Sequence, residues 1–163
     1  YDLPYIIVRP TNNYGIGQYV EKLIPKSCKY LKLGKKIPLH NAGTPIRNWL
    51  HAADTADAIM TIIESGTKNE IYNISGDYEQ SNIDTVQQII KLSDKNYHIY
   101  LDDGVPYAEN YDEYIDLSFN RQGQDVRYSI NDTKLKNLGW NPTKVFKDEL
   151  PEIVNYYTEN FIW

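Results

Sequence analysis

The sequence predicts an α/β fold, and three observations lead to this prediction. Short apolar or alternating segments at residues 5–9, 37–40, 46–50 and 70–75 are typical of strands. Longer segments between and after them carry apolar residues at helical spacing. The first strand runs into an Asn/Gly-rich turn and then a helix, which is where open α/β sheets hold their ligands. Helices and short strands alternate along the chain, as this fold class requires.

The composition is that of one folded domain. The chain has 163 residues, 41% hydrophobic and 24% charged, so it can bury a core and is too apolar for disorder. Its net charge of −5 argues against a nucleic-acid partner, because such proteins carry a basic surface. No apolar run reaches the roughly 18 residues of a membrane span, and the start has no signal-peptide pattern. We therefore expect a soluble, cytoplasmic protein without a membrane partner.

The first half of the chain predicts three strands and two helices. A strand at 5–9 is followed by a turn at 11–18 and a helix at 19–33 that ends at Gly34, with Pro25 expected to kink or restart it. Two short strands, 37–40 and 46–50, lead to a helix at 53–65 that ends at Gly66. One face of this helix is expected to be buried through Ala56, Ile59, Met60 and Ile63.

The second half begins with a strand at 70–75 and a helix that runs to about Leu92, with Ser81 or Asn82 as its cap. An acidic, tyrosine-rich stretch follows, with strands expected at 97–101 and 114–119. A short strand at 127–130, a small helix from 131 that closes at Gly139, and a final helix at 145–161 complete the chain.

Few residues suggest chemistry. The three His and the single Cys28 lack the close spacing of a metal site, and Cys28 lies among apolar helical positions, as a buried residue would. There is no nucleophile elbow and no Walker loop, and the Gly15–Gly17 pair is too short for a dinucleotide fingerprint. The remaining candidates for a binding site are three cations at or beside turns, next to Asn and Gln residues: Lys22, Arg47 and Arg121. They suit the capture of a phosphate, but a solvated surface explains them equally well.

Taken in order, several motifs resemble the carboxyl half of nucleotide-sugar 4,6-dehydratases, in the extended short-chain dehydrogenase/reductase superfamily. The carrying residues are Asn12-Asn-Tyr-Gly15 with 21–25, Ile37-Pro-Leu-His40, Ile46-Arg-Asn-Trp-Leu50, 71–74, 82–84, Arg121-Gln-Gly-Gln-Asp125 and Leu138-Gly-Trp140. The resemblance covers residues 5–161 and is strongest to the dTDP-glucose enzymes, with UDP-glucose enzymes nearly as similar. It implies the last strands of a Rossmann-like sheet and a mixed α/β substrate-binding domain over 1–163, with the NAD-binding Rossmann half absent from this chain.

The resemblance also implies a lyase activity. This family oxidises a nucleotide-diphospho-glucose at C4 with bound NAD, removes water across C5–C6 and returns the hydride to C6, in deoxysugar and rhamnose biosynthesis. The partner is then a nucleotide-diphospho-sugar with either thymidine or uridine, and the parent protein is expected to be a homodimer.

By the same resemblance, each motif has an expected role. Asn13 touches the cofactor and Asn12 the sugar or phosphate. Lys22 and Leu23 line the nucleotide path, and Pro38, Leu39 and His40 flank the base. Arg47 and Arg121 grip the diphosphate beside Asn82, and the segment Asn120, Arg121, Gln122, Gly123 and Gln124 closes over the nucleotide.

Several departures separate this chain from the family pattern, including Gly15-Ile16 in place of a Gly-Pro pair and a longer acidic stretch at 97–116. Gln122 and Gln124 stand where the family's loop has Pro and His. The Gly-rich cofactor loop, the acid–base pair and the Tyr-x-x-x-Lys dyad do not occur in the sequence, so we expect no catalytic residue in this chain and no activity from it alone. Two alternatives stay open: the same half of a UDP-sugar epimerase or decarboxylase, and a non-catalytic binding module.

Overall fold

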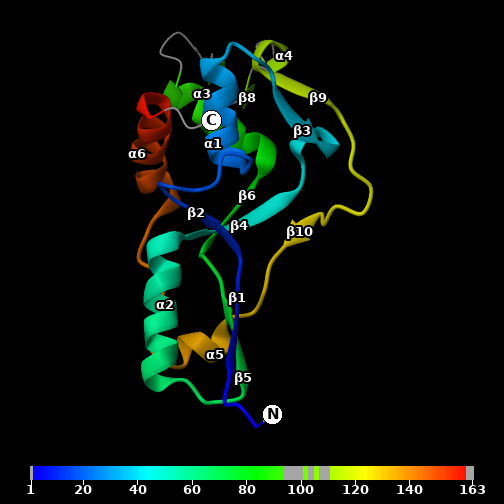
Figure 1. Cartoon of the computed structure of the whole chain (residues 1–163). Helices are drawn as coiled ribbons and strands as arrows, with labels where there is room; N and C mark the ends of the chain where they lie inside the picture. The colour runs from blue at the N-terminus through cyan, green and yellow to red at the C-terminus, as the bar shows by residue number, and fades with distance from the viewer. Residues whose placement is uncertain (1, 94–100, 103–104, 107–110, 161–163) are drawn as a thin grey trace. The chain divides into compact units, whose positions relative to one another are not determined.

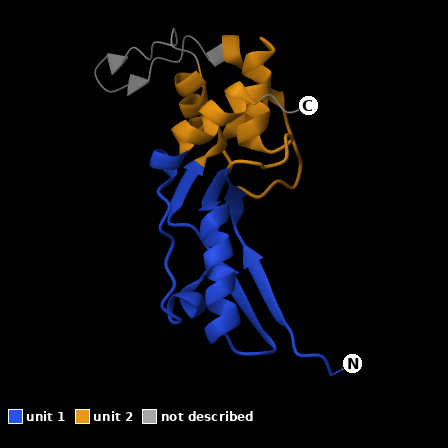
Figure 2. Cartoon of the chain, turned by 60° about the vertical axis from the view of Figure 1, so that its left-hand side comes forward, with its two compact units in different colours: residues 1–15, 46–80, 127–149 blue, residues 16–45, 81–126, 150–163 orange. Residues whose placement is uncertain are grey.

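The computed structural model describes residues 2–93, 101–102, 105–106 and 111–160 (Figure 1). The chain forms two compact units, coloured separately in Figure 2. Unit 1 comprises residues 1–15, 46–80 and 127–149, and unit 2 comprises residues 16–45, 81–126 and 150–163. The chain therefore passes from one unit to the other five times, after residues 15, 45, 80, 126 and 149.

Unit 1 contains two groups of strands. β1 (Ile6–Pro10) and β5 (Glu70–Ile74) pair in parallel, with Val8 opposite Tyr72. β4 (Ile46–His51) pairs in parallel with both β2 (Asn12–Tyr14) and β10 (Arg127–Tyr128), and it also pairs with β6 (Tyr78–Ser81). The predicted strands near 5–9, 46–50, 70–75 and 127–130 are thus confirmed, whereas β2 lies in the expected turn at 11–18 and β6 was not predicted.

The helices of unit 1 pack on the β1–β5 pair. They are α2 (Ala52–Ser65) and α5 (Thr133–Lys136), and Figure 1 shows both beside β5. The core beside them consists of buried apolar side chains from β4, α2, β5, α5 and the segment that follows α5, namely Leu50, Ala58, Ile62, Tyr72, Ile74, Leu135 and Trp140, and Ile6 of β1 packs against it.

The predicted inner face of α2 is right only for Ile59, which packs against the unit 1 core. Met60 and Ile63 are 53% and 67% exposed, while Asp54, Ala58 and Ile62 are buried at i, i+4 spacing. Asp54 sets this rotation, because its carboxylate accepts backbone N–H bonds from Thr143 (3.1 Å) and Lys144 (3.0 Å). A buried carboxylate with two such donors is satisfied, so the polar residue takes a position that an apolar pattern would not assign to it.

Unit 2 is built on one parallel pair covered by helices. β3 (Ile37–His40) pairs with β9 (Ile115–Phe119), and α1 (Leu23–Lys32) packs on α3 (Asn82–Ser93). Its core contains Ile37, Leu39, Val86, Ile90 and Ile115. A short 3₁₀ turn, η1 (Asn41–Gly43), follows β3, and α4 (Tyr111–Tyr114) precedes β9.

Smaller pieces complete the described chain. β7 (Leu101–Asp102) pairs antiparallel with β8 (Val105–Pro106), and most of the strand expected at 97–101 lies outside the described residues. α6 (Phe146–Glu159) corresponds to the final predicted helix and contributes residues to both units.

The structure corrects the predicted start of one helix and shows which of two predicted residues caps another. α1 begins at Leu23 and not at residue 19, and Pro25 occupies its first turn, where backbone N–H groups have no helical partner. Pro25 therefore neither kinks nor restarts the helix. At α3 the cap is Ser81, since its hydroxyl accepts the N–H of Asp84 (3.1 Å) and donates to the Asp84 carboxylate (2.5 Å).

Candidate functional site

β3 and β9 end together at a pair of rings in unit 2. The two strands run parallel, and the register places His40 opposite Phe119. Their ring centroids lie 5.9 Å apart at an interplanar angle of 65°, and both side chains are exposed. Because the carboxyl ends of parallel strands are where α/β folds hold ligands, this end of the pair is the candidate site.

The loop after β9 is tied to the residue after β3. The side-chain Nδ2 of Asn41 donates to the carbonyl of Arg121 (3.2 Å) and to Oε1 of Gln124 (3.1 Å). In return, the backbone N–H of Arg121 donates to Oδ1 of Asn41 (2.9 Å). One amide thus meets both backbone groups of Arg121, as a neighbouring strand would. Beyond this point the Arg121 side chain is exposed.

The turn that carries Asn41 is held against α3. Gly43 has φ +69°, and a Cβ on it would lie 2.8 Å from Cβ of Ile83, so a larger residue would force the turn away from the helix. The backbone N–H of Asn82 donates to the carbonyl of Pro45 (3.0 Å). The start of α3 and the end of β3 are therefore positioned together.

Several of the predicted site residues meet at this place. His40, Asn82, Arg121 and Gln124 belong to its elements, and Pro38 lies in β3 opposite Asp116. Leu39 is 2% exposed and packs in the unit 2 core, so only its backbone can reach a ligand.

The remaining predicted residues of unit 2 lie at its surface or beside its core. Lys22 is exposed next to the first turn of α1, and Leu23 packs against the unit 2 core. Asn120, Gln122 and Gly123 are exposed in the loop after β9.

The other predicted residues lie in unit 1. Asn13 donates from Nδ2 to the carbonyl of Thr11 (3.1 Å), and its Oδ1 accepts from the Thr55 hydroxyl (2.6 Å), so its amide joins β2 to α2. Asn12 lies on β2 opposite Trp49 and is half-buried. Arg47 lies on β4 and donates to the carbonyl of Ile46 (2.8 Å). Arg47 belongs to unit 1, whereas Arg121 belongs to unit 2.

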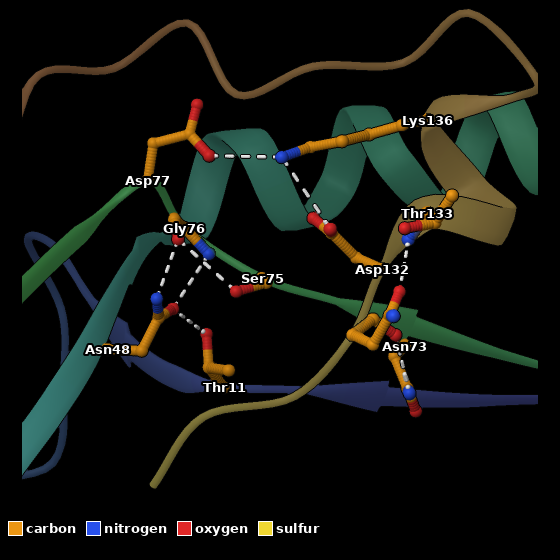
Figure 3. A network of polar contacts seen from close by, with 10 residues as sticks. Thr11, Asn48, Asn73, Ser75, Gly76, Asp77, Asp132, Thr133 and Lys136 are labelled. Carbon is orange, nitrogen blue, oxygen red and sulfur yellow. Dashed lines mark hydrogen bonds and ion pairs between the residues drawn. The ribbon is translucent and has the colours of Figure 1, made fainter. Parts of the chain in front are cut away.

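A buried amide organises the ends of the unit 1 strands (Figure 3). Oδ1 of Asn48 accepts from the Thr11 hydroxyl (2.7 Å) and from the N–H of Gly76 (2.8 Å), and Nδ2 donates to the carbonyl of Gly76 (2.6 Å). Sequence reasoning missed both Asn48 and Asn41. The only signal for Asn48 is a polar residue placed among the apolar residues of a strand.

Two buried titratable groups belong to the core. Cys28 is 3% exposed, as expected, and burial raises the pKa of its thiol to about 12, which disfavours the thiolate near neutral pH. Burial, together with the charges of Glu149 and Asp54, also raises the pKa of Tyr14. Its ring contacts Trp49, His51 and Phe146, so Tyr14 is a core residue.

The described residues lack two kinds of feature. They contain no group of three or more His, Cys, Asp or Glu side chains arranged to hold a metal ion. None of the helices among them is both long and apolar enough to cross a membrane.

Comparison with known proteins gives a consistent result. Residues 1–75 match the model of the "NAD dependent epimerase/dehydratase family". The chain is 37% identical over 164 residues to the dTDP-glucose 4,6-dehydratase of Shigella flexneri and 32% identical over 161 residues to the human dTDP-D-glucose 4,6-dehydratase. All or nearly all of this chain aligns, but it spans only 43% of the length of each relative.

Solved structures have the same fold. The dTDP-glucose 4,6-dehydratase of Bacillus anthracis, crystallised with NAD, superposes with a TM-score of 0.78 at 36% identity, over 95% of this chain and 45% of that one. A UDP-glucose 4-epimerase of Thermotoga maritima superposes with a TM-score of 0.77 at 20% identity, over 98% of this chain and 47% of that one, which shows the fold alone. The predicted Rossmann-like α/β fold of the extended superfamily is confirmed.

Proposed function

From the similarity of the whole chain to dTDP-glucose 4,6-dehydratases, we propose that it is part of a sugar-nucleotide 4,6-dehydratase and binds the nucleotide-sugar. With NAD bound, the parent protein would convert a nucleotide-diphospho-glucose to its 4-keto-6-deoxy derivative with loss of one water. The observation that carries this proposal is the 37% identity along the full chain to enzymes of that name.

We propose further that the chain corresponds to the carboxyl-terminal part of these relatives. β1 and β5 form a two-stranded parallel sheet within the described residues, yet Ile7, Val8 and Ile71 on it are 43%, 36% and 37% exposed. Parallel sheets are normally larger and covered on both faces. We therefore propose that β1 and β5 form the edge of a larger sheet, whose other strands belong to the rest of the parent protein.

The alternative, an amino-terminal part, predicts a Gly-rich loop between a strand and a helix within residues 1–75, and no such loop occurs there.

The candidate site in unit 2 binds the nucleotide in this proposal. The His40 and Phe119 rings contact the base, with Pro38 and Asn82 beside them, and the Arg121 guanidinium binds the diphosphate. Leu39 contributes its backbone, Lys22 and Leu23 line the approach, and the loop of Asn120, Gln122, Gly123 and Gln124 covers the nucleotide. Arg47 and Asn12, which both belong to unit 1, are proposed contacts of the diphosphate and of the sugar or phosphate, respectively.

The cofactor is held mainly by residues outside this chain. Asn13 is the one candidate contact here, and its amide already joins Thr11 to Thr55, so it approaches NAD as a fixed group. When bound, NAD supplies the hydride chemistry, while the residues of this chain orient the nucleotide-sugar. The parent protein is a homodimer in this proposal, and light scattering after gel filtration tests that state.

A product assay tests the activity. The full-length protein with bound NAD should convert dTDP-glucose or UDP-glucose to a product lighter by one water, detected by mass spectrometry. The 163-residue chain alone should convert neither donor. Failure of the full-length protein with both donors contradicts the proposal, and a product that is only epimerised at C4 assigns the parent to the epimerases instead.

Nucleotide affinity tests the grip. Arg47→Ala and Arg121→Ala should each weaken binding of the diphosphate by about 1.5–3 kcal/mol, because each removes a charge-assisted hydrogen bond. Arg127→Ala is the matched control, since its guanidinium already pairs with the Glu79 carboxylate (2.8 Å). An arginine whose removal leaves calorimetric affinity unchanged does not contact the ligand.

A further inference from the structure

The loop after β9, residues 120–124, contains no proline that would restrict its backbone. It carries Gln122 and Gln124, and Gly123 within it has φ +70°. The chain from Asn120 to Gly123 is exposed. A segment of this kind loses considerable conformational entropy when it closes over a ligand, so something must hold it in place beforehand.

Asn41 supplies that hold. Its amide makes three hydrogen bonds to the loop, at 2.9, 3.1 and 3.2 Å, across 80 to 83 residues of sequence. Two of them satisfy the N–H and carbonyl of Arg121, which fixes the backbone from which the guanidinium projects. The third reaches the side chain of Gln124.

The backbone at Asn41 supports a role beyond simple packing. Asn41 and Ala42 both have φ +52°, a left-handed conformation that costs non-glycine residues about 1 kcal/mol or more. Asparagine tolerates this conformation better than most residues and carries an amide, whereas glycine would tolerate it best and offer no side chain. The conformation aims the amide at the loop.

We propose that Asn41 is a positioning residue that preorganises the loop of residues 120–124 and thereby sets the affinity for the nucleoside diphosphate. This inference rests on the proposed function of the same site. Asn41 acts through Arg121 and Gln124 and does not need to touch the nucleotide. Without the amide, a smaller fraction of molecules holds the loop in the conformation that binds the nucleotide. The apparent affinity falls in proportion to that fraction.

Asn41→Gly tests the proposal, because it deletes the amide and relieves the backbone. The variant should remain folded. In the full-length protein, hydrogen exchange at the Arg121 amide should accelerate by roughly tenfold. The Kd for dTDP and the KM for dTDP-glucose should rise by about tenfold together, with kcat within twofold, since binding is lost equally in the ground and transition states. Ala42→Gly, at the same φ and with an exposed side chain, is the control. It should leave the exchange rate at Arg121, the Kd for dTDP and the KM for dTDP-glucose unchanged.

The outcomes separate the two claims. If the wild-type protein binds dTDP and Asn41→Gly binds it equally well, the positioning role is wrong. Unchanged exchange at Arg121 in Asn41→Gly also overturns it. If the wild-type protein binds neither dTDP nor UDP, the proposed function fails, and the inference built on it fails for that reason.

Discussion

Asn48→Ala is the substitution whose cost follows most directly from the structure. Asn48 is 4% exposed, and its amide holds the β1–β2 junction at Thr11 to the turn after β5 at Gly76. The substitution removes three hydrogen bonds, each with a net contribution of about 1 kcal/mol. It also leaves the buried N–H of Gly76 without its partner, which costs a further 1 kcal/mol or more, roughly. The carbonyl of Gly76 keeps a bond from the Ser75 hydroxyl (3.2 Å).

We therefore expect Asn48→Ala to lower the free energy of unfolding by about 3–5 kcal/mol. Urea unfolding followed by tryptophan fluorescence measures this, because Trp49 and Trp140 are 5% and 3% exposed and report on burial in unit 1. Asn155→Ala, an exposed position on α6, is the matched control and should stay within about 0.5 kcal/mol of the wild type.

A double-mutant cycle makes the test sharper. Thr11→Val removes one donor while Oδ1 of Asn48 keeps the N–H of Gly76, so it should cost about 1 kcal/mol. In the Asn48→Ala background the same change should cost much less, since its acceptor is already gone. A loss below about 1.5 kcal/mol for Asn48→Ala, or full additivity of the two changes, would refute the reasoning.

Three further predictions concern other positions. In Gly76→Ala the added Cβ would lie 1.9 Å from the carbonyl oxygen of Trp49, so the backbone must shift; we expect a loss of about 4 kcal/mol or more in urea unfolding, and wild-type stability would contradict the close approach. Ala42→Gly should raise the unfolding free energy by about 1 kcal/mol because it relieves a left-handed backbone, and an unchanged or lower urea midpoint would contradict that. The raised pKa of Cys28 stabilises the fold below pH 9.0, the ordinary thiol value, and this contribution is lost as the pH rises toward about 12. Urea midpoints between pH 8 and 11, which should fall less steeply in Cys28→Ala, measure the effect, and equal slopes would argue against it.

Helices and strands were predictable from the sequence wherever the spacing of apolar residues kept one period over enough residues. α2 and α3 repeat apolar residues over three turns or more, and β3, β4 and β5 are bounded by Gly, Pro or Asn. β2 and β6 have three and four residues, too few for any period to stand out. The inner face of α2 was misread because a satisfied carboxylate, Asp54, replaced an apolar residue at a buried position.

The candidate site was predictable only in part, for a different reason. The cations and amides around Arg121 were identifiable by residue type and by position after strands. Their supports were not, because the bonds of Asn41 join residues 80 and 83 positions away, and those of Asn48 join residues 28 and 37 positions away. The residues next to Asn41 and Asn48 in the sequence do not indicate hydrogen bonds to such distant partners.

The five passages of the chain between its units constrain how this protein can be divided. Cleavage of any single peptide bond between residues 16 and 149 gives two products, and neither of them contains a whole unit. Neither unit can therefore be transferred between genes as one uninterrupted stretch of coding sequence. Changes of individual side chains and of loop length, by contrast, leave this path of the chain between the units intact.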